Sequence, residues 1–427
     1  MAQPKVNMNL SEQQRAAVDT LSARRPFGQA SLSGPAGSGK TSIITGILDA
    51  RPSAVVVAFT NAAAKVLRRK GLAATTIHKR FYMPEERRTV EGKKYTAFVP
   101  CHAYQGKLPD GKLAFSPTII IDEASMVSSK VLSDLRQMSD EIILVGDGSQ
   151  LPPVGDLKAP RGVFNTLSHT AVLTEIHRQA EGNPALKVAT AVRLGEVSPT
   201  DFNLLRGFEA LDADGFSRAI ANLDAEGKTW KAISFTNATR CRLNNRVRKH
   251  YGHASSVTPQ PGEIMVCTAN YSDTVTNGTF LRVIEATTPA LAPHRDNLIG
   301  RIRAEIIDDD TEVEIPFSFG NHLCELADPD LVKLGKRLVM LGRDLDDAPS
   351  GARLSFGYAV TCHKAQGSEY DHVFLCDERS AVAAVAARSA AENIECKDPL
   401  SGREAAQRWL YTALTRTRGG LSLVRAW

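Results

Sequence analysis

Cysteine is scarce in this chain, and its few thiols are not grouped. The seven cysteines are spread between Cys101 and Cys396 and include no Cys-x-x-Cys pair. An odd, scattered set argues against a zinc site and a disulfide framework, and it fits reduced thiols in the cytoplasm. Long apolar runs are also missing: nothing approaches about 18 consecutive apolar residues, and residues 1–14 lack the apolar core of a signal peptide. We therefore expect a cytoplasmic protein without a membrane partner.

An excess of one charge sign is missing too. The 52 basic and 47 acidic residues leave a formal net charge of +5, which permits a basic binding face without requiring one. Hydrophobic residues make up 43% of the 427 positions, so the size of the core is not limiting. A chain longer than the usual domain of about 100 to 200 residues predicts two large units with insertions.

A glycine-rich segment carries the strongest signal. Residues 34–41 follow the pattern G-x-x-x-x-G-K-[ST], after a possible strand and before an apolar-periodic stretch. Such a loop turns backbone N–H groups toward the phosphates of a nucleoside triphosphate, and the following helix adds its positive dipole end. Lys40 would place a charge at the β- and γ-phosphate oxygens, and Thr41 would offer a hydroxyl ligand to Mg²⁺. The expected nucleotide contacts are Gly34, Pro35, Ala36, Gly37, Ser38, Gly39, Lys40, Thr41 and Ser42.

Two carboxylates follow the predicted strand 118–121. Asp122 and Glu123 would lie at the carboxyl end of a sheet strand, where ligand sites form in α/β folds. With a phosphate loop earlier in the chain, Asp122 is the natural Mg²⁺ partner, and Glu123 is the candidate to orient or deprotonate the attacking water. The alternative is a charge pair at a helix N-terminus.

Three further side chains are candidates for the γ-phosphate. Gln150 follows the predicted strand 142–145, and its amide could switch partners when phosphate is present, although a plain turn glutamine is the alternative. Phosphoryl transfer also requires positive charge on the far side of the γ-phosphate. Arg178 and Arg416 are the candidates, and only their local sequence separates them from surface charges.

The order of apolar runs predicts the domain organisation. Val- and Ile-rich runs at 54–59, 118–121 and 142–145 alternate with helical segments such as 62–69 and 128–138, which is typical of a buried parallel sheet with crossover helices. A similar alternation returns later in the chain. We predict an α/β fold with two large domains, the first from 1–80 and 116–170 and the second from 171–250 and 351–427.

Two insertions interrupt this pattern. Residues 81–115 contain short β-type pieces around turn signals and predict an inserted hairpin. They also hold six aromatic residues with basic residues between them, so a wedge that stacks on bases and a mini-domain with its own core are both open. Residues 251–350 contain four β-like stretches separated by turns, one of them Asn277-Gly278, and predict a small antiparallel barrel.

Taken in order, these segments resemble the motifs of superfamily 1 helicases, specifically the RecD-like, 5′ to 3′ branch that includes small phage helicases. The matching segments are residues 10–14 (Q motif), 34–42 (motif I), 58–64 (motif Ia), 76–79 (the T-I-H element), 122–125 (motif II), 146–153 (motif III), the region around 178 (motif IV), 358–367 (motif V) and 411–418 (motif VI). The resemblance spans nearly the whole chain. It implies two RecA-like P-loop domains that close on ATP in the cleft between them, with Arg178 and Arg416 reaching across from the second domain.

The resemblance also implies contacts beyond the phosphate loop. Gln14 would recognise the adenine base, and Gly367 would contribute to nucleotide binding. The implied nucleic-acid contacts are Thr60, Asn61, His78, Phe98, Thr361 and His363. For Thr60, Asn61, Thr361 and His363 the alternative is ordinary strand-end capping, and for His78 it is a packed core position. Residues 240–249 carry five basic side chains and no acid, and they form either a solvated helix face or a border of the nucleic acid.

These expectations describe an ATP- and Mg²⁺-dependent DNA helicase that moves 5′ to 3′ along single-stranded DNA and separates duplexes at their junctions. The alternatives are a viral-type superfamily 1 RNA helicase and a nucleotide-switched translocase that grips single strands without unwinding. We expect a monomer in the cytoplasm of a bacterial or phage-infected cell, with replication or recombination proteins as partners.

Overall fold

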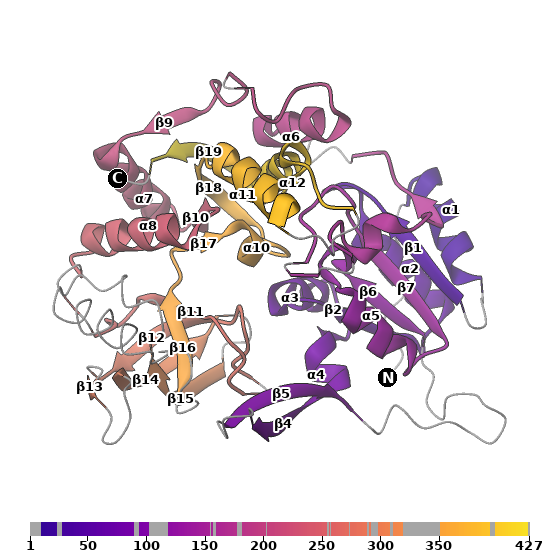
Figure 1. Cartoon of the computed structure of the whole chain (residues 1–427), viewed down its shortest axis with the longest axis horizontal. Helices are drawn as coiled ribbons and strands as arrows, with labels where there is room; N and C mark the ends of the chain where they lie inside the picture. Colours follow the sequence, from indigo (N-terminus) through magenta and orange to yellow (C-terminus); the bar gives the residue numbers. More distant parts are fainter. Residues whose placement is uncertain are drawn as a thin grey trace.

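The computed structural model contains two parallel sheets, a small barrel and a separate hairpin (Figure 1). The residues that the structure describes are 10–23, 28–88, 94–101, 118–153, 155–156, 159–176, 182–201, 203–253, 256, 258–272, 274–287, 290–291, 298–307, 311–318, 351–392 and 398–425. Statements about elements and contacts below refer to these residues.

The first sheet has six parallel strands in the order β3-β2-β6-β7-β1-β8. Its strands are β1 (Gly28–Ser33), β2 (Val55–Ala58), β3 (Ala74–Thr76), β6 (Ile119–Asp122), β7 (Glu141–Gly146) and β8 (Ala171–Val172). The central strands are buried on both faces because consecutive Val and Ile side chains enter two different cores. One core packs against α1 (Glu12–Ser22), α2 (Lys40–Ala50) and α3 (Asn61–Arg69), and the other against α4 (Ile77–Phe81) and α5 (Ser129–Arg136).

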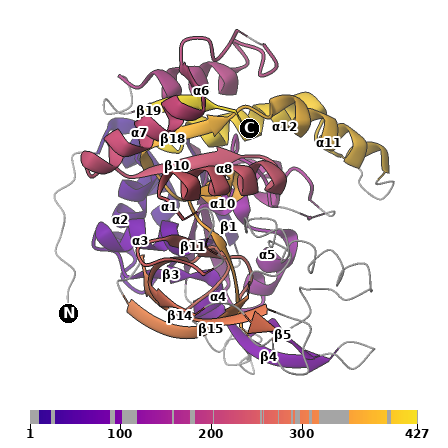
Figure 2. The same cartoon turned by 90° about the vertical axis from the view of Figure 1, so that its left-hand side faces the viewer.

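The second sheet has five parallel strands in the order β17-β10-β18-β19-β9. Its strands are β9 (Glu209–Leu211), β10 (Trp230–Ser234), β17 (Ala359–Thr361), β18 (Tyr370–Cys376) and β19 (Thr417–Val424). The accompanying helices are α6 (Pro184–Leu194), α7 (Ala213–Ala225), α8 (Asn237–His250), α10 (Cys362–Ala365), α11 (Arg379–Glu392) and α12 (Gly402–Leu414). Two separate parallel sheets with crossover helices confirm the predicted α/β fold class. Figure 2 shows the second sheet and its helices stacked above the first domain and the barrel.

The barrel closes through five strands. They are β11 (Ile264–Cys267), β12 (Phe280–Ala286), β14 (Leu298–Ile306), β15 (Thr311–Ser318) and β16 (Ala352–Phe356), and the short β13 (Ala290–Leu291) adds to β14. Neighbours pair in the order β12-β11-β16-β15-β14, and pairing of β14 with β12 completes the ring. The inward-facing apolar side chains of these strands fill its core together with residues of α7 and α8. The predicted barrel is therefore present, but it is not antiparallel throughout, because β15 and β16 pair in parallel.

Helix α8 corrects the solvated-face alternative for two arginines of the basic stretch 240–249, while the alternative of a border with nucleic acid stays a prediction. Arg248 and Glu263 are each 1% exposed in their side chains and form an ion pair of 2.8 Å between helix and barrel. Arg240 is also buried and donates to Ser355 Oγ on β16. The helix carries Leu243 and Val247 toward the core, so the arginines on the same side are buried with them. Only Arg242 and Lys249 of this stretch are exposed.

The inserted hairpin pairs β4 (Tyr82–Arg88) with β5 (Lys94–Pro100) in antiparallel register. It stands apart from both parallel sheets and lies near the barrel in both views (Figures 1 and 2). Two strands fall outside the domain limits drawn from sequence: β8 adds to the first sheet and β16 to the barrel. Both are short segments whose composition does not favour one neighbouring sheet over the other, so pairing decides their place. The remaining limits stay predictions.

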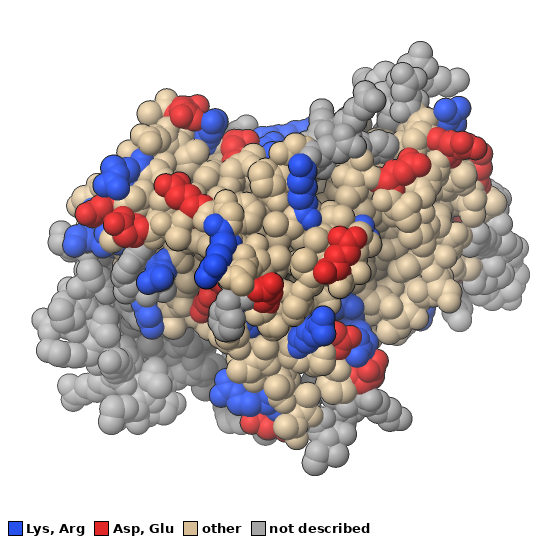
Figure 3. All heavy atoms as spheres, turned by 90° about the horizontal axis from the view of Figure 1, so that it is seen from above, with Lys and Arg blue, Asp and Glu red and all other residues tan. Residues whose placement is uncertain are grey.

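The visible surface carries both charge signs. In the face shown in Figure 3, Lys and Arg side chains are interspersed with Asp and Glu rather than gathered in one field. The face shown in Figure 3 therefore offers no broad electrostatic attraction to a polyanion.

Among the described residues, none of the helices combines the length and the hydrophobicity that a membrane span requires.

Candidate functional site

The loop 34–41 has the backbone geometry that its glycines permit. Gly37 and Gly39 have φ angles of 80° and 82°, in the left-handed region that other residues rarely adopt. A Cβ on Gly34 would stand 2.6 Å from Ser38 Oγ. Gly34 N–H donates to Gly146 O at 3.1 Å, which ties the loop to the end of β7. The loop therefore sits at the carboxyl edge of the first sheet, at the start of α2.

Lys40 and Gln14 both contact this loop. Lys40 Nζ donates to the carbonyls of Gly34 and Pro35 at 2.8 and 2.9 Å, which keeps the ammonium over the loop. Gln14 is buried, accepts from Ser11 N–H through Oε1, and donates to Ser38 O at 3.1 Å through Nε2. The same amide that sequence assigned to the base therefore braces the loop from the start of α1. The Ser11–Gln14 capping box is the signal for this contact.

Asp122 and Glu123 occupy the end of β6, as the motif predicts. Burial and, to a smaller extent, the Glu123 carboxylate beside it raise the pKa of the Asp122 carboxyl to about 7, whereas Lys40 opposes the shift. Glu123 has a φ of 53°, and it is the only residue other than glycine with a positive φ in the described part of the chain. A left-handed glutamate costs on the order of 1 to 3 kcal/mol and is typical of functional sites.

The donor set at this edge fits Mg²⁺. Asp122 supplies a carboxylate beside the charge of Lys40, and Thr41 supplies a hydroxyl in the first turn of α2. Hard oxygen donors in small number are typical of Mg²⁺ sites that share the ion with a nucleotide and water. Among the residues described, no group of three or more His, Cys, Asp or Glu could hold a metal ion by itself. The site therefore suits a metal that arrives with a phosphate ligand.

Gln150 is buried in the segment that follows β7. The residue is 2% exposed, and its Oε1 has no hydrogen-bond partner in the described part of the chain. Its backbone is fixed, since its N–H donates to Asp147 O and its carbonyl accepts from Arg408 Nη1 at 3.1 Å. The plain turn glutamine does not describe this residue, because an exposed turn side chain would be hydrated.

Helix α12 of the second domain forms hydrogen bonds with the segment 147–151 of the first domain, and this line of contacts is the seam between the domains. Arg408 Nη1 also donates to Gly148 O at 2.6 Å, and Leu151 N–H donates to Thr412 Oγ1 at 3.0 Å. From α10's C-terminal side, Gln366 Nε2 donates to Leu151 O at 3.1 Å. Sequence reasoning missed this seam. Arg408 and Thr412 are four residues apart and so lie on one face of the helix, which was a possible signal for a domain contact. Arginine and threonine at this spacing are, however, common on any helix.

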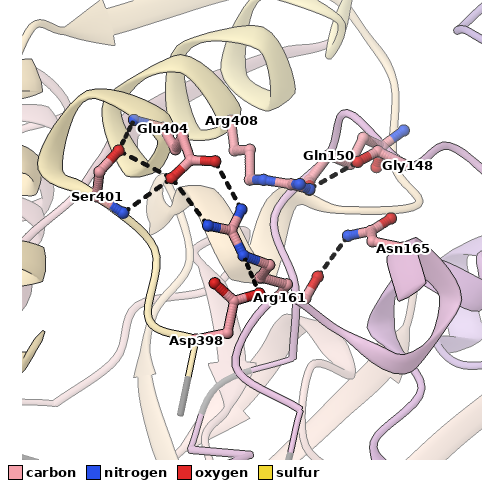
Figure 4. A network of polar contacts seen from close by, with 8 residues as sticks. All are labelled: Gly148, Gln150, Arg161, Asn165, Asp398, Ser401, Glu404 and Arg408. Atoms are coloured by element: carbon pink, nitrogen blue, oxygen red, sulfur yellow. Dashed lines mark hydrogen bonds and ion pairs between the residues drawn. The ribbon is translucent and has the colours of Figure 1, made fainter. Parts of the chain in front are cut away.

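Charged side chains extend this seam (Figure 4). Arg161 follows the segment 146–153 in the first domain. Its Nη1 and Nη2 donate to Glu404 Oε1 and Oε2 at 2.6 and 3.3 Å. Its Nε pairs with Asp398 Oδ2 at 2.7 Å. Arg161 is the main cause that lowers the pKa of Glu404 to about 2. Glu404 also caps α12 with Ser401, so the ion pair joins the start of this helix to the first domain.

The two predicted arginines differ in what the structure describes. Arg178 lies outside the described residues. Arg416 is buried, and its guanidinium donates to Thr412 O, Ser368 O and Thr415 Oγ1 at 3.0 to 3.2 Å. All three acceptors belong to the second domain. The arginine therefore anchors the end of α12, and its contact with a phosphate stays a prediction.

Gly367 lies against the first domain's α3. Its φ is 75°, and a Cβ there would stand 2.7 Å from Thr60 Oγ1 and 3.1 Å from Ala63 Cβ. Gly367 thus allows close approach of motif V to motif Ia, while its predicted role with the nucleotide stays a prediction. Thr60 caps α3 by accepting from Ala63 N–H, and Asn61 donates to Thr276 and Thr279 beside the Asn277–Gly278 turn. The capping alternative describes Thr60 in this structure.

His78 and Phe98 belong to one aromatic cluster. The His78 ring lies 5.0 Å from Tyr82, 6.1 Å from Phe59 and 6.3 Å from Phe98, measured between centroids. Burial lowers the pKa of His78, which favours its neutral form. The cluster joins α4, the end of β2 and both hairpin strands. Each ring is only partly buried, so packing and base stacking remain compatible.

Thr361 and His363 lie at the start of α10. Thr361 occupies the N-cap position without a side-chain cap hydrogen bond, so the capping alternative does not hold for it. His363 is partly exposed, and desolvation lowers its pKa to about 4. A neutral imidazole beside an unengaged threonine suits polar contacts to a ligand.

A cavity of about 700 Å³ opens where α3, the second sheet and the barrel meet. Its walls include five aromatic residues, namely Trp230, Tyr251, Phe280, Tyr358 and Tyr370, and six basic residues, namely Lys65, Arg69, Lys228, Lys231, Arg282 and Arg418. Of its three acidic residues, Asp224 accepts from Trp230 Nε1 and Tyr251 Oη, and Glu263 pairs with Arg248. The wall therefore combines ring faces with net positive charge. Sequence reasoning missed this cavity because its residues come from distant segments.

Two family models match the chain. The AAA domain model matches residues 9–222, half of the chain, and the UvrD-like helicase C-terminal domain model matches residues 356–388. The first covers the P-loop, the Asp122–Glu123 pair and the segment 147–151. The second covers Gly367 and α10.

Two curated relatives are helicases. The ATP-dependent RecD2 DNA helicase of Deinococcus radiodurans is 24% identical over 391 residues, which are 86% of this chain and 45% of that protein. The ATP-dependent DNA helicase dda of Enterobacteria phage T4 is 30% identical over 239 residues, which are 51% of each protein. The chain spans about half the length of the curated relatives it matches.

Solved structures share the fold. Bacteroides Pif1 bound to ssDNA has a TM-score of 0.51 at 17% identity, over 98% of this chain and 92% of that one. A Pif1 helicase from a study of unwinding at forked dsDNA has a TM-score of 0.53 at 17% identity, over 97% and 92%. Because the AAA domain model matches half of the chain, the chain belongs to the AAA domain family, and along its length it is similar to the RecD-like helicases of superfamily 1.

Proposed function

We propose that this chain is an ATP- and Mg²⁺-dependent DNA helicase that moves 5′ to 3′ along single-stranded DNA and separates duplexes. One observation carries the proposal. The phosphate loop, a partly buried carboxylate and a strained glutamate meet at the edge of the first sheet, next to a segment that the second domain holds. A site of this kind can link a change at the γ-phosphate to movement between domains.

The chain's own residues would carry the hydrolysis as follows. Backbone N–H groups of the loop bind the phosphates, and Lys40 exchanges the carbonyls of Gly34 and Pro35 for β- and γ-phosphate oxygens. The Glu123 carboxylate orients the attacking water and accepts its proton. Mg²⁺, held by Asp122 and Thr41, would neutralise charge that develops on the phosphates.

Gln150 would respond to the γ-phosphate. No donor among the described residues reaches its buried Oε1, and an unsatisfied buried acceptor costs about 1 to 3 kcal/mol. The attacking water would satisfy this oxygen, while the amide nitrogen can donate to phosphate. Because Arg408 holds the Gln150 carbonyl, the second domain is in direct contact with this residue. Arg178 and Arg416 would add positive charge from that domain.

The junction of α3, the second sheet and the barrel would hold the strand. Ring faces and cations line the cavity there, and base stacking with phosphate neutralisation is how single strands bind without sequence preference. Thr361 and His363 would add polar contacts, Asn61 would contribute from α3, and the His78–Phe98 cluster would meet bases at the hairpin. Loss of binding with added salt is expected, because phosphate contacts release counterions.

The choice of DNA and of direction rests on the relatives. RecD2 and dda are named DNA helicases, and one Pif1 structure contains ssDNA. We extend DNA as substrate, 5′ to 3′ direction, a monomeric state and replication or recombination partners to this chain as proposals, together with action in the cytoplasm.

ATPase stimulation tests the substrate. Turnover is measured alone, with single-stranded DNA and with single-stranded RNA of matched sequence. We expect strong stimulation by DNA and little by RNA. Stimulation by RNA alone would replace the proposal with the viral-type RNA helicase, and DNA-stimulated turnover without strand displacement would leave the nucleotide-switched translocase.

A further inference from the structure

Tyr411 makes a contact that no motif assignment explains. It lies on α12, is 2% exposed, and has its hydroxyl between two parts of the first domain. The hydroxyl accepts from the Ala36 N–H of the phosphate loop at 3.4 Å and donates to Asp147 Oδ2 at 2.6 Å. One side chain of the second domain therefore bridges the loop and the segment that carries Gln150.

Asp147 passes this contact to its own turn. It is buried, and its second oxygen, Oδ1, accepts from Ser149 N–H at 3.0 Å. Its backbone carbonyl accepts from Gln150 N–H at 3.1 Å. The carboxylate thus fixes both the turn and the Tyr411 hydroxyl. A shift of α12 that moves this hydroxyl would disturb the loop and the turn together.

The ring of Tyr411 does not need its hydroxyl for packing. The ring belongs to the buried core of the second domain, which also contains Trp409 and Leu410. A phenylalanine at position 411 would bury the same ring without the hydroxyl. A buried tyrosine hydroxyl is retained where it has hydrogen-bond partners. Burial and Asp147 raise the pKa of Tyr411 well above its usual value, so the group stays a donor across the working pH range.

We infer that Tyr411 is a positioning residue. Its hydroxyl links the phosphate loop, at Ala36, to the turn that runs from Asp147 to Gln150, and so makes the conformation of both depend on the position of the second domain. The inference rests on the proposed function, because it concerns regulation of the same ATP site. It assigns Tyr411 no contact with substrate. Its effect is on how often the turn and the loop adopt the reactive arrangement.

The test compares three variants of the full chain. Tyr411→Phe removes only the hydroxyl. Asp147→Asn removes the charge but keeps an acceptor oxygen for Tyr411. Ser129→Ala is the matched control, since it removes another hydroxyl bond to a carboxylate of the first domain, Ser129 Oγ to Asp156 at 2.8 Å. The measurements are DNA-stimulated kcat and KM for ATP, nucleotide Kd by a fluorescent analogue, and the Tm.

We expect Tyr411→Phe to lower kcat about tenfold, the size expected for one hydrogen bond to a charged group, with nucleotide Kd within about threefold of wild type. Asp147→Asn keeps one oxygen acceptor, so it should lower kcat less, and the double variant should be no slower than Tyr411→Phe, because both substitutions act on the hydrogen bond between Tyr411 and residue 147. Ser129→Ala should keep wild-type kinetics. An unchanged kcat in Tyr411→Phe, or additive losses in the double variant, would overturn the inference.

The outcome is separable from that of the proposed function. Wild-type protein that hydrolyses ATP without displacing a strand contradicts the helicase proposal, yet the kcat comparison still decides the role of Tyr411. Conversely, wild-type unwinding with an unaffected Tyr411→Phe variant contradicts only the inference. If Tyr411→Phe fails to fold, the Asp147→Asn variant takes its place in the test. A lower kcat at unchanged nucleotide Kd supports the positioning role of Tyr411, and a wild-type kcat overturns it.

Discussion

The two sides of the proposed nucleotide site are built in different ways. On the first domain, the phosphate loop, Asp122 and Glu123 all come from strand ends of one parallel sheet. On the second domain, the contacts come from one face of α12 and from Gln366. The first side consists of side chains held at one edge of a single sheet. The second side consists of contacts between the two domains.

This difference separates catalysis from coupling. A strand end fixes the side chain that follows it, so Lys40 and Asp122 keep their relation whatever the second domain does. The α12 contacts exist only while the domains stay together. Damage to the first side should therefore stop chemistry, and damage to the seam should change rates while leaving nucleotide binding intact.

The largest effect is expected from Lys40→Ala. The ammonium lies over the loop and is the charge that we propose for the phosphates, so its loss should reduce ATP turnover at least about a thousandfold. Lys130→Ala is the control, because that exposed lysine pairs only with Asp134 on the same helix. Turnover near wild type in Lys40→Ala would contradict the assignment of the first side.

Asp122 should make the first side sensitive to pH. With a pKa of about 7, the carboxylate is mostly protonated at pH 6 and mostly ionised at pH 8, so apparent Mg²⁺ affinity should rise about tenfold over this range. The raised pKa also means that Asp122 stabilises the metal-free fold below about pH 4 and that this contribution is lost as pH rises through 7. Asp122→Asn should remove both dependences. Titrations of Mg²⁺ and urea melts at each pH measure them.

Phe98→Ala should separate strand opening from turnover. The ring belongs to the cluster around His78, and one base-aromatic contact is worth about 1 to 3 kcal/mol. We expect unwinding to slow up to about tenfold while DNA-stimulated ATPase stays within about twofold. The control is Met83→Ala, an exposed position on the same hairpin. Equal loss of both activities in Phe98→Ala would show that the cluster is only a structural core.

The smallest effect is expected from Arg161→Gln. This ion pair across the seam is partly exposed, so its loss should cost at most about 1 kcal/mol of stability and slow turnover only about twofold. The difference from wild type should shrink in high salt, which thermal melts and ATPase assays at two ionic strengths would reveal. A salt-independent loss would point instead to a role for Arg161 in placing Asn165, which donates to its carbonyl.

The sequence predicted what is local. Val and Ile runs located the central strands because a strand buried on both faces must be apolar throughout. The phosphate loop and Asp122 lie at strand ends as expected, while their roles stay predictions. Prediction from the sequence failed where burial depends on a partner surface. Arg240 and Arg248 look like solvated charges until Ser355 and Glu263 are brought to them.

The same limit applies to the seam. Tyr411 and Arg408 have no spacing that distinguishes a domain contact from an ordinary helix face, because the partner segment 147–151 is about 260 positions away in the chain. The Asn61 contact with the barrel was equally hidden, since the barrel's place against α3 follows from pairing of distant strands.

Unwinding of paired duplexes that differ only in the polarity of their single-stranded tail tests the central claim most directly. The account predicts ATP-dependent strand release from the 5′-tailed DNA and little from the 3′-tailed one, with Lys40→Ala inactive on both. Release from the 3′-tailed duplex alone, or ATP hydrolysis without release from either, would contradict it.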